Sequence, residues 1–310
     1  MQSMSSSGSR GRLAALFSAQ DMSQGAPWRR ILEFSLPMLI GNLAQQMYNT
    51  ADSVIVGIYV GDNALAAVGS ASPILNLLLA LFVGVSTGAG ILVSQYFGAK
   101  DKERLSGVVG NCLTLTLLSS LIIMVIAPFV TRPLLELLNT PASILDWCSD
   151  YLNIFFLGIL GFAAYNILSG VLRGLGDSLS SLVFLIVATV LNIGLDVWFV
   201  AGLRMGVAGV ALATILAQAI SAVLCFLKLI RMHDVFVLHA RDLRRMKDCV
   251  WKIVRLGVPS GVTQAIFSTA MLVVQSLTNS FGEAVVACNV IVMRVDGFAM
   301  MPNFTFGQAM

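Results

Sequence analysis

The chain has 310 residues, of which 57 % are hydrophobic and only 11 % are charged, against roughly 25 % charged residues in an ordinary soluble domain. So few charges cannot cover the surface of a soluble protein of this size. Water-soluble enzymes and ordinary soluble binding modules are therefore excluded, and the net charge of +3 is too small to indicate a nucleic-acid partner. The composition predicts an all-α polytopic membrane protein.

Transmembrane helices need about 20 mostly apolar residues, and the chain offers eight such stretches in order. The first 28 residues precede them, are rich in Ser and Gly, and are predicted to form a disordered cytosolic tail rather than a cleaved signal peptide. Short connections between the stretches favour neighbouring antiparallel helices. The predicted spans are 31–58, 64–97, 105–131, 148–172, 179–200, 206–230, 251–280 and 284–310.

Basic residues gather on alternate connections between these spans. Most of the 19 Lys and Arg residues fall on the side that holds the N-terminus, including a group from Arg241 to Lys247. Cytosolic loops carry the excess of Lys and Arg in membrane proteins. We therefore predict a multi-pass protein of the cell membrane with its N-terminus in the cytosol.

An internal repeat divides the chain. A Leu-Pro pair ending at Pro37 opens the first span, and a Val-Pro pair ending at Pro259 opens the seventh; a glycine followed by an acid closes both spans, at Gly61 and Gly282. Parallel repeats of this kind build the two lobes of many secondary transporters. The second copy stops at Met310, before the first copy would end. A chance similarity between two membrane helices is the alternative interpretation.

The repeat predicts four parts, of which the second is a complete lobe and the last is the beginning of another. On this interpretation the chain is a fragment or a partial gene product. The parts are the tail (1–28), a first lobe of six helices (29–230), a cytosolic linker (231–250) and the first two helices of a second lobe (251–310).

Polar side chains recur at helical spacing in the first span, at Asn42, Gln45, Asn49 and Asp52. Intervals of three or four residues place all of them on one helical face. An ionisable group at membrane depth costs about 2.5 to 3.5 kcal/mol on insertion scales. We therefore expect this polar stripe to line a cavity or to face other helices.

Further polar groups lie in three other spans. Asn192 and Asp196 share a face of the fifth span, Thr214 lies in the sixth, and Asn166 lies in the fourth. Measured from the outer connections, Asp52, Asp196 and Thr214 fall at similar depths. Asn166 lies deeper and meets them only if its helix tilts inward.

Two carboxylates in one low-dielectric pocket repel each other, and burial also disfavours their charged forms. Such a pair suits the holding of a proton that is released when a pocket opens or a cation arrives. The oxygen atoms of Asp52, Asp196, Asn192 and Thr214 suit Na⁺ equally well. The alternative is a polar cluster that only holds four helices together.

Two backbone features accompany the polar residues. Pro37 is expected to kink or weaken the first helix, because proline cannot donate the hydrogen bond that a helix interior requires. The kink is a candidate hinge coupled to Asp52, or a tolerated distortion. Gly84 and Gly88 have the GxxxG spacing that is typical of close helix packing.

Four stretches together resemble the multidrug and toxic compound extrusion (MATE) family of cation-coupled transporters, and within it the DinF-like branch. The resemblance implies a V-shaped antiporter of twelve helices in two lobes. This chain would hold the six-helix N-terminal lobe and the first two helices of the second. The stretches are LPMLIGNLAQQMYNTADSVIVG (36–57), LSGVLRGLGDS (168–178), LNIGLDVWFVAGLRMGVAGVALAT (191–214) and MRVDGFAMMPN (293–303).

The resemblance also implies roles for single residues. Asp52 would be the central cation-coupling acid, and Pro37 the point where the first helix bends. The NorM-type branch uses an acid in the seventh span, where this chain has only Gln264 and Gln275 as long polar side chains. The implied hydrogen-bonding pocket around Asp52 consists of Asp196, Asn192, Asn166 and Thr214.

These observations favour a multidrug-efflux antiporter that exports amphipathic, often cationic, organic compounds in exchange for H⁺ or Na⁺. It would need no cofactor, and its partners would be drug-like substrates, the lipid bilayer, and the missing second lobe or a partner chain. A flippase for lipid-linked precursors would call for a cationic cavity, but Arg294 is the one basic residue that lies inside a predicted span and away from the cytosolic ends of the spans. A non-transporting truncated fragment is the third possibility. No nucleophile–base pair indicates an enzyme.

Overall fold

The computed structural model describes residues 27–137, 142–232, 247–279, 296–297, 299–303 and 305–307, and these are helices joined by short turns. The last three ranges form short helical turns. The helices are α2 (Pro27–Tyr59), α3 (Asp62–Gly98), α4 (Lys102–Leu137), α5 (Ala142–Leu157), α6 (Ile159–Gly174), α7 (Ser178–Asp196), the π-helical η1 (Val197–Gly202), α8 (Gly206–Ile230) and α9 (Lys247–Asn279).

Helices occupy the first seven predicted spans. The fourth span is broken: α5 and α6 meet at an angle of 55°, with Gly158 between them. By length and composition, three helices can cross a membrane and the bent pair makes a fourth. Most of the eighth predicted span and of the linker 231–250 lies outside the described residues. The prediction of an all-α fold is confirmed.

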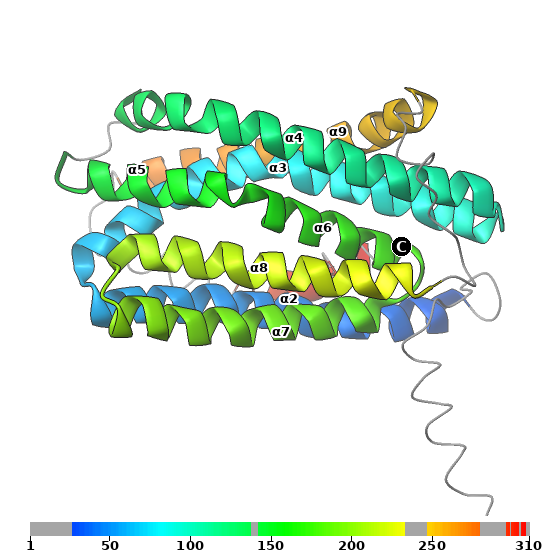
Figure 1. Cartoon of the computed structure of the whole chain (residues 1–310), viewed down its shortest axis with the longest axis horizontal. Helices are drawn as coiled ribbons and strands as arrows, with labels where there is room; N and C mark the ends of the chain where they lie inside the picture. The colour runs from blue at the N-terminus through cyan, green and yellow to red at the C-terminus, as the bar shows by residue number, and fades with distance from the viewer. Residues whose placement is uncertain are drawn as a thin grey trace, which may run out of the picture.

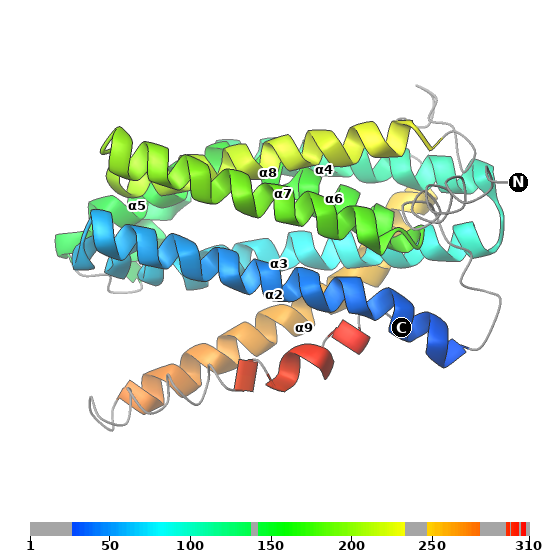
Figure 2. The same ribbon diagram turned by 90° about the horizontal axis from the view of Figure 1, so that it is seen from below.

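The helices form two groups with α5 and α6 between them (Figure 1). On one side α3 and α4 lie with α9, and on the other α2, α7 and α8 lie together. α8 packs against both α6 and α7, and α2 packs along α7. In Figure 2, α9 runs obliquely beneath α3, and the turns at 296–307 lie beside α2.

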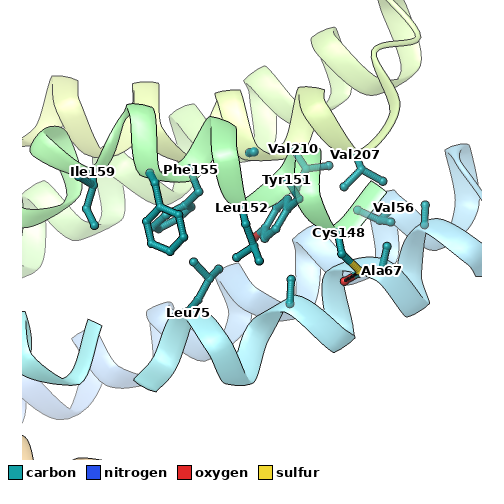
Figure 3. Packing of buried hydrophobic residues seen from close by; sticks show 14 of the residues in the cluster. Val56, Ala67, Leu75, Cys148, Tyr151, Leu152, Phe155, Ile159, Val207 and Val210 are labelled. Carbon is teal, nitrogen blue, oxygen red and sulfur yellow. Dashed lines mark hydrogen bonds between the residues drawn. The ribbon is translucent and has the colours of Figure 1, made fainter. Parts of the chain in front are cut away.

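Two buried apolar clusters hold the bundle together. One surrounds α5 and includes Val56, Leu152 and Phe155, which are almost completely shielded from solvent (Figure 3). The other joins α3, α4, α6, α8 and the start of α9, and it includes Leu172 and Ile253, which have no exposed surface. Large apolar side chains also point outward, as expected of a surface that faces lipid.

Glycines bring α3 and α9 into backbone contact. A Cβ atom added at Gly84 would lie 2.6 Å from the carbonyl oxygen of Gly257 and from the Cα atom of Gly261. A Cβ atom at Gly88 would lie 2.6 Å from the amide nitrogen of Gly257. Because no side chain fits at these distances, the close packing predicted for Gly84 and Gly88 is confirmed, and α9 is the partner.

A tight turn joins α6 to α7. Gly176 adopts a positive φ of 80°, which favours glycine. Asp177 then caps α7, because its carboxylate accepts hydrogen bonds from the amide nitrogen of Ser180 at 3.0 Å and from its hydroxyl at 2.7 Å. An N-terminal cap of this kind satisfies backbone donors that a helix leaves free. The turn therefore fixes where the inner faces of both helices begin.

Candidate functional site

Three helices bring four of the predicted polar residues together. α2 carries Asp52, which is half-buried, and the end of α7 carries Asn192 and Asp196, which have no exposed surface. α8 supplies Thr214, which is 7 % exposed. The packing of α7 against both α2 and α8 places these side chains in one buried cluster, which we call the acid cluster.

Asn192 connects the two acids. We orient its amide with the nitrogen toward the carboxylates, because the opposite orientation sets the amide oxygen against other acceptors. The nitrogen then donates to Oδ1 of Asp52 at 2.7 Å and to Oδ2 of Asp196 at 3.3 Å. In the opposite orientation it faces Oγ1 of Thr214 at 3.5 Å. Asn192 therefore lies within reach of all three partners.

The carboxyl groups of Asp52 and Asp196 also lie within electrostatic range of each other. Ionised carboxylates only accept hydrogen bonds, so two acids this close are stabilised by a proton or a cation between them. Oδ1 of Asp196 is buried and has no hydrogen-bond partner among the described residues. An unpaired carboxylate oxygen beside a second acid is suited to hold a proton or a monovalent cation.

Two tyrosines that the sequence analysis did not single out border the acid cluster. Tyr48 and Tyr151 are 5 % and 7 % exposed, and both lie within electrostatic range of Asp52 and Asp196. The Tyr48 hydroxyl is near Thr214 but has no hydrogen bond of ordinary geometry. Its place one turn before Asp52 is a usable sequence signal, whereas nothing in the sequence links Tyr151 to the acids.

Asn166 makes its hydrogen bonds outside the acid cluster. Its side-chain nitrogen donates to the carbonyl oxygen of Phe162, one turn back in α6, at 2.8 Å. Its own carbonyl oxygen accepts a hydrogen bond from Ser86 of α3 at 2.7 Å. These hydrogen bonds of Asn166 tie α6 to itself and to α3, and neither of them reaches the acid cluster.

The rest of the α2 polar stripe does not share one environment. Asn42 donates from Nδ2 to the hydroxyl of Thr305 at 2.9 Å, Gln45 is half-buried, and Asn49 is exposed. Asp52 is the residue of the stripe that contacts the acid cluster, through the amide of Asn192. The amide of Asn42 instead links α2 to the last described turn of the chain.

Pro37 lies inside α2, and the helix continues past it to Tyr59. The proline lacks the N–H group that would donate to the carbonyl of Glu33. A small apolar pocket lies beside this stretch, between α2 and residues 302–306.

Arg294 lies outside the described residues.

The sequence model of the MatE family matches residues 37–198, more than half of the chain. The chain belongs to the MATE family. This match covers the acid-bearing parts of α2 and α7, and it places the chain among transporters rather than enzymes.

Relatives agree with this assignment. The probable multidrug resistance protein YoeA of Bacillus subtilis is 31 % identical over 298 residues, which are 94 % of this chain and 64 % of YoeA. The multidrug export protein MepA of Staphylococcus saprophyticus is 24 % identical, over 87 % of this chain and 60 % of MepA. This MATE chain therefore spans less than two thirds of the length of these relatives.

Solved structures agree as well. A MOP superfamily transporter from Pyrococcus furiosus matches with a TM-score of 0.86 at 27 % identity, over 94 % of this chain and 65 % of its own. A MATE transporter in a bent conformation matches with a TM-score of 0.84 at 28 % identity, over 92 % of this chain and 64 % of its own. The MATE fold of the chain is thus supported by both sequence and shape.

Proposed function

We propose that this chain forms the cation-coupling lobe of a secondary antiporter that exports amphipathic, often cationic, organic compounds. The coupling ion is H⁺ or Na⁺, and no cofactor takes part. The single observation that carries the proposal is the buried contact between Asp52 and Asp196, joined by Asn192. The multidrug names of the relatives support the substrate class.

The geometry supports a simple coupling mechanism. A cation or proton at the acid cluster removes the repulsion between Asp52 and Asp196 and draws α2 toward α7. Its loss leaves two acceptors in contact and favours separation of the helices. α2 also contains Pro37, where the helix lacks one backbone hydrogen bond. We propose that Pro37 is the hinge at which α2 bends as occupancy of the cluster changes.

The membrane setting is part of this proposal. The excess of basic residues on the side of the N-terminus supports a cytosolic N-terminus and insertion in the cell membrane. In this orientation the acid cluster lies in the outer half of the bilayer. An inward cation gradient would then load it from outside, and the substrate would leave in exchange.

The test is ethidium efflux from drug-sensitive bacteria that produce the chain, under an imposed H⁺ or Na⁺ gradient. Asp52→Asn is expected to abolish gradient-dependent efflux while the amount of protein in the membrane is unchanged, because an amide can neither carry the proton nor neutralise a cation. Asp150→Asn is the matched control, since Asp150 is an exposed acid on α5.

Undiminished efflux by Asp52→Asn would refute the coupling mechanism. The gradient that drives efflux identifies the coupling ion. A chain that inserts and exports nothing would favour the alternative of a non-transporting membrane fragment.

A further inference from the structure

α8 carries a second line of buried polar groups, which begins at the acid cluster. Thr214, Gln218, Ser221 and Cys225 follow at intervals of four, three and four residues, so they lie on one face of the helix. They are 7 %, 4 %, 0 % and 0 % exposed. α8 packs against α5, α6 and α7, and these four side chains are buried in that packing. We call these four residues the α8 track.

The middle of the α8 track is unsatisfied. Oε1 of Gln218 and Oγ of Ser221 are buried and have no hydrogen-bond partner among the described residues. A buried polar atom without a partner costs about 1 to 3 kcal/mol, and such atoms are normally paired with protein groups or with internal water. Two of them in succession on one face indicate a place for water.

The outer end of the α8 track reaches the acid cluster, because Thr214 lies 3.5 Å from the amide of Asn192. At the other end, Cys225 lies within electrostatic range of Arg173. Arg173 donates to the hydroxyls of Ser169 at 2.8 Å and Ser181 at 3.3 Å. Polar groups therefore continue from the track to the ends of α6 and α7.

Charges at this end are of both signs. Asp177 also lies within electrostatic range of Cys225, and its carboxylate is 3.8 Å from Nζ of Lys228, whose side chain is 26 % exposed. The carboxylate of Asp177 therefore adds a negative charge at the end of the track where Arg173 and Lys228 lie. Lys228 marks the point at which these groups reach the surface.

We propose that the α8 track is a hydrated path through this lobe, along which the coupling cation moves between the acid cluster and the cytosol. From Thr214 to Cys225 the track rises about 16 Å at 1.5 Å per residue, about half of a hydrocarbon core that is about 30 Å thick. The cation would thus leave without crossing the route of the exported compound. This role of the track rests on the proposed function.

The first test asks whether the path holds water. Hydroxyl radicals, generated from water by an X-ray pulse, oxidise side chains that touch water, and mass spectrometry of the full chain locates the products. Cys225 is expected to be oxidised severalfold faster than Cys112, a free thiol of α4 that is 1 % exposed. Equal rates for these two buried thiols would overturn the proposal.

The second test asks whether the path carries the cation. Ser221→Ala is expected to slow gradient-driven ethidium efflux about tenfold, which corresponds to about 1.4 kcal/mol of added barrier, and to reduce the oxidation of Cys225. Ser120→Ala is the matched control, because the Ser120 hydroxyl on α4 is equally buried and also lacks a partner among the described residues. A Ser221→Ala variant with unchanged efflux would overturn the proposal.

The two proposals fail in different ways. Undiminished efflux by Asp52→Asn refutes the coupling mechanism, whereas the oxidation of Cys225 relative to Cys112 does not depend on transport. A dry track in a chain whose efflux requires Asp52 refutes the path alone. Gln218→Leu serves as the second variant of the track, and it is expected to lower the oxidation of Cys225 in the same way.

Discussion

The two acids of the site differ in their surroundings. Asp196 has no exposed surface, while Asp52 is half-buried on the helix that also carries Pro37. A buried acid and a partly accessible one, bridged by the amide of Asn192, suit a site that must both bind and release a proton or a cation. Asp52 is thus the member through which the site can respond to a change in α2.

At this scale Tyr48 gives a stability prediction. Its hydroxyl is buried without a hydrogen bond of ordinary geometry, so Tyr48→Phe removes an unpaired polar atom and is expected to raise the free energy of unfolding by about 1 kcal/mol. Ser86→Ala is the contrast, because the buried hydroxyl of Ser86 donates to the carbonyl oxygen of Asn166 at 2.7 Å, and its loss is expected to lower the free energy of unfolding by about 1 kcal/mol.

Thermal unfolding in detergent, without added Na⁺, measures both changes. A destabilisation by Tyr48→Phe as large as that by Ser86→Ala would show that the Tyr48 hydroxyl has a partner.

Among the elements, η1 follows directly after α7, the helix that carries Asn192 and Asp196. α7 ends at Asp196, and the chain continues as a π-helix in which the amide of Leu203 donates to the carbonyl of Trp198 at 2.9 Å. Single π-helical turns are frequent at functional sites. The helix continues through η1 to Gly202 as one span, so Asp196 lies at the point where the helix type changes.

The contact between α3 and α9 gives a prediction at the same scale. Gly84→Ala would place a methyl group 2.6 Å from the backbone of Gly257, so the helices must separate, and the expected loss is about 1 to 3 kcal/mol. Gly98→Ala is the matched control on the same helix, because nothing lies within 4 Å of a Cβ atom there.

The melting temperatures of the two variants in detergent provide the measurement. A Gly84→Ala protein as stable as Gly98→Ala would mean that α3 and α9 do not approach as closely as the structure shows.

For the whole molecule, one hydrogen bond joins the first described helix to the last described turn. Asn42 donates to the hydroxyl of Thr305, which is 1 % exposed. Thr305→Val keeps the shape of the side chain, removes this acceptor, and is expected to destabilise the fold by about 1 kcal/mol. Thr263→Val is the control, since that exposed hydroxyl donates only to its own helix, at Pro259.

Chemical denaturation in detergent compares the two threonine variants. Equal midpoints would show that the contact between α2 and the last turn contributes nothing to stability.

The sequence is most informative about polar side chains at membrane depth, because placing them there costs free energy. Asp52, Asn192, Asp196 and Thr214 could be grouped in advance, because polar groups at membrane depth need partners. Asn166 could not be placed in the same way, since an amide can also bond the carbonyl of its own helix. Membership of the MATE family follows from the sequence as well, while the orientation in the membrane and the coupling ion remain predictions.

Other features are hidden from sequence patterns. Tyr151 belongs to an apolar stretch in which a tyrosine is ordinary, so only the packing of α5 reveals its position near the acids. The bend of 55° between α5 and α6 leaves hydropathy unchanged, so two helices read as one span. The glycine spacing of α3 predicts a close partner but does not identify α9.

The glycine contact between α3 and α9 has a consequence for the synthesis of the protein. Its two halves, Gly84 with Gly88 and Gly257 with Gly261, lie far apart along the chain. At about 5 to 20 residues per second, the ribosome needs roughly ten to thirty seconds after making the first half before it completes the second. During this interval the surface of α3 at Gly84 and Gly88 must be covered by lipid or by an insertion factor, which α9 then displaces.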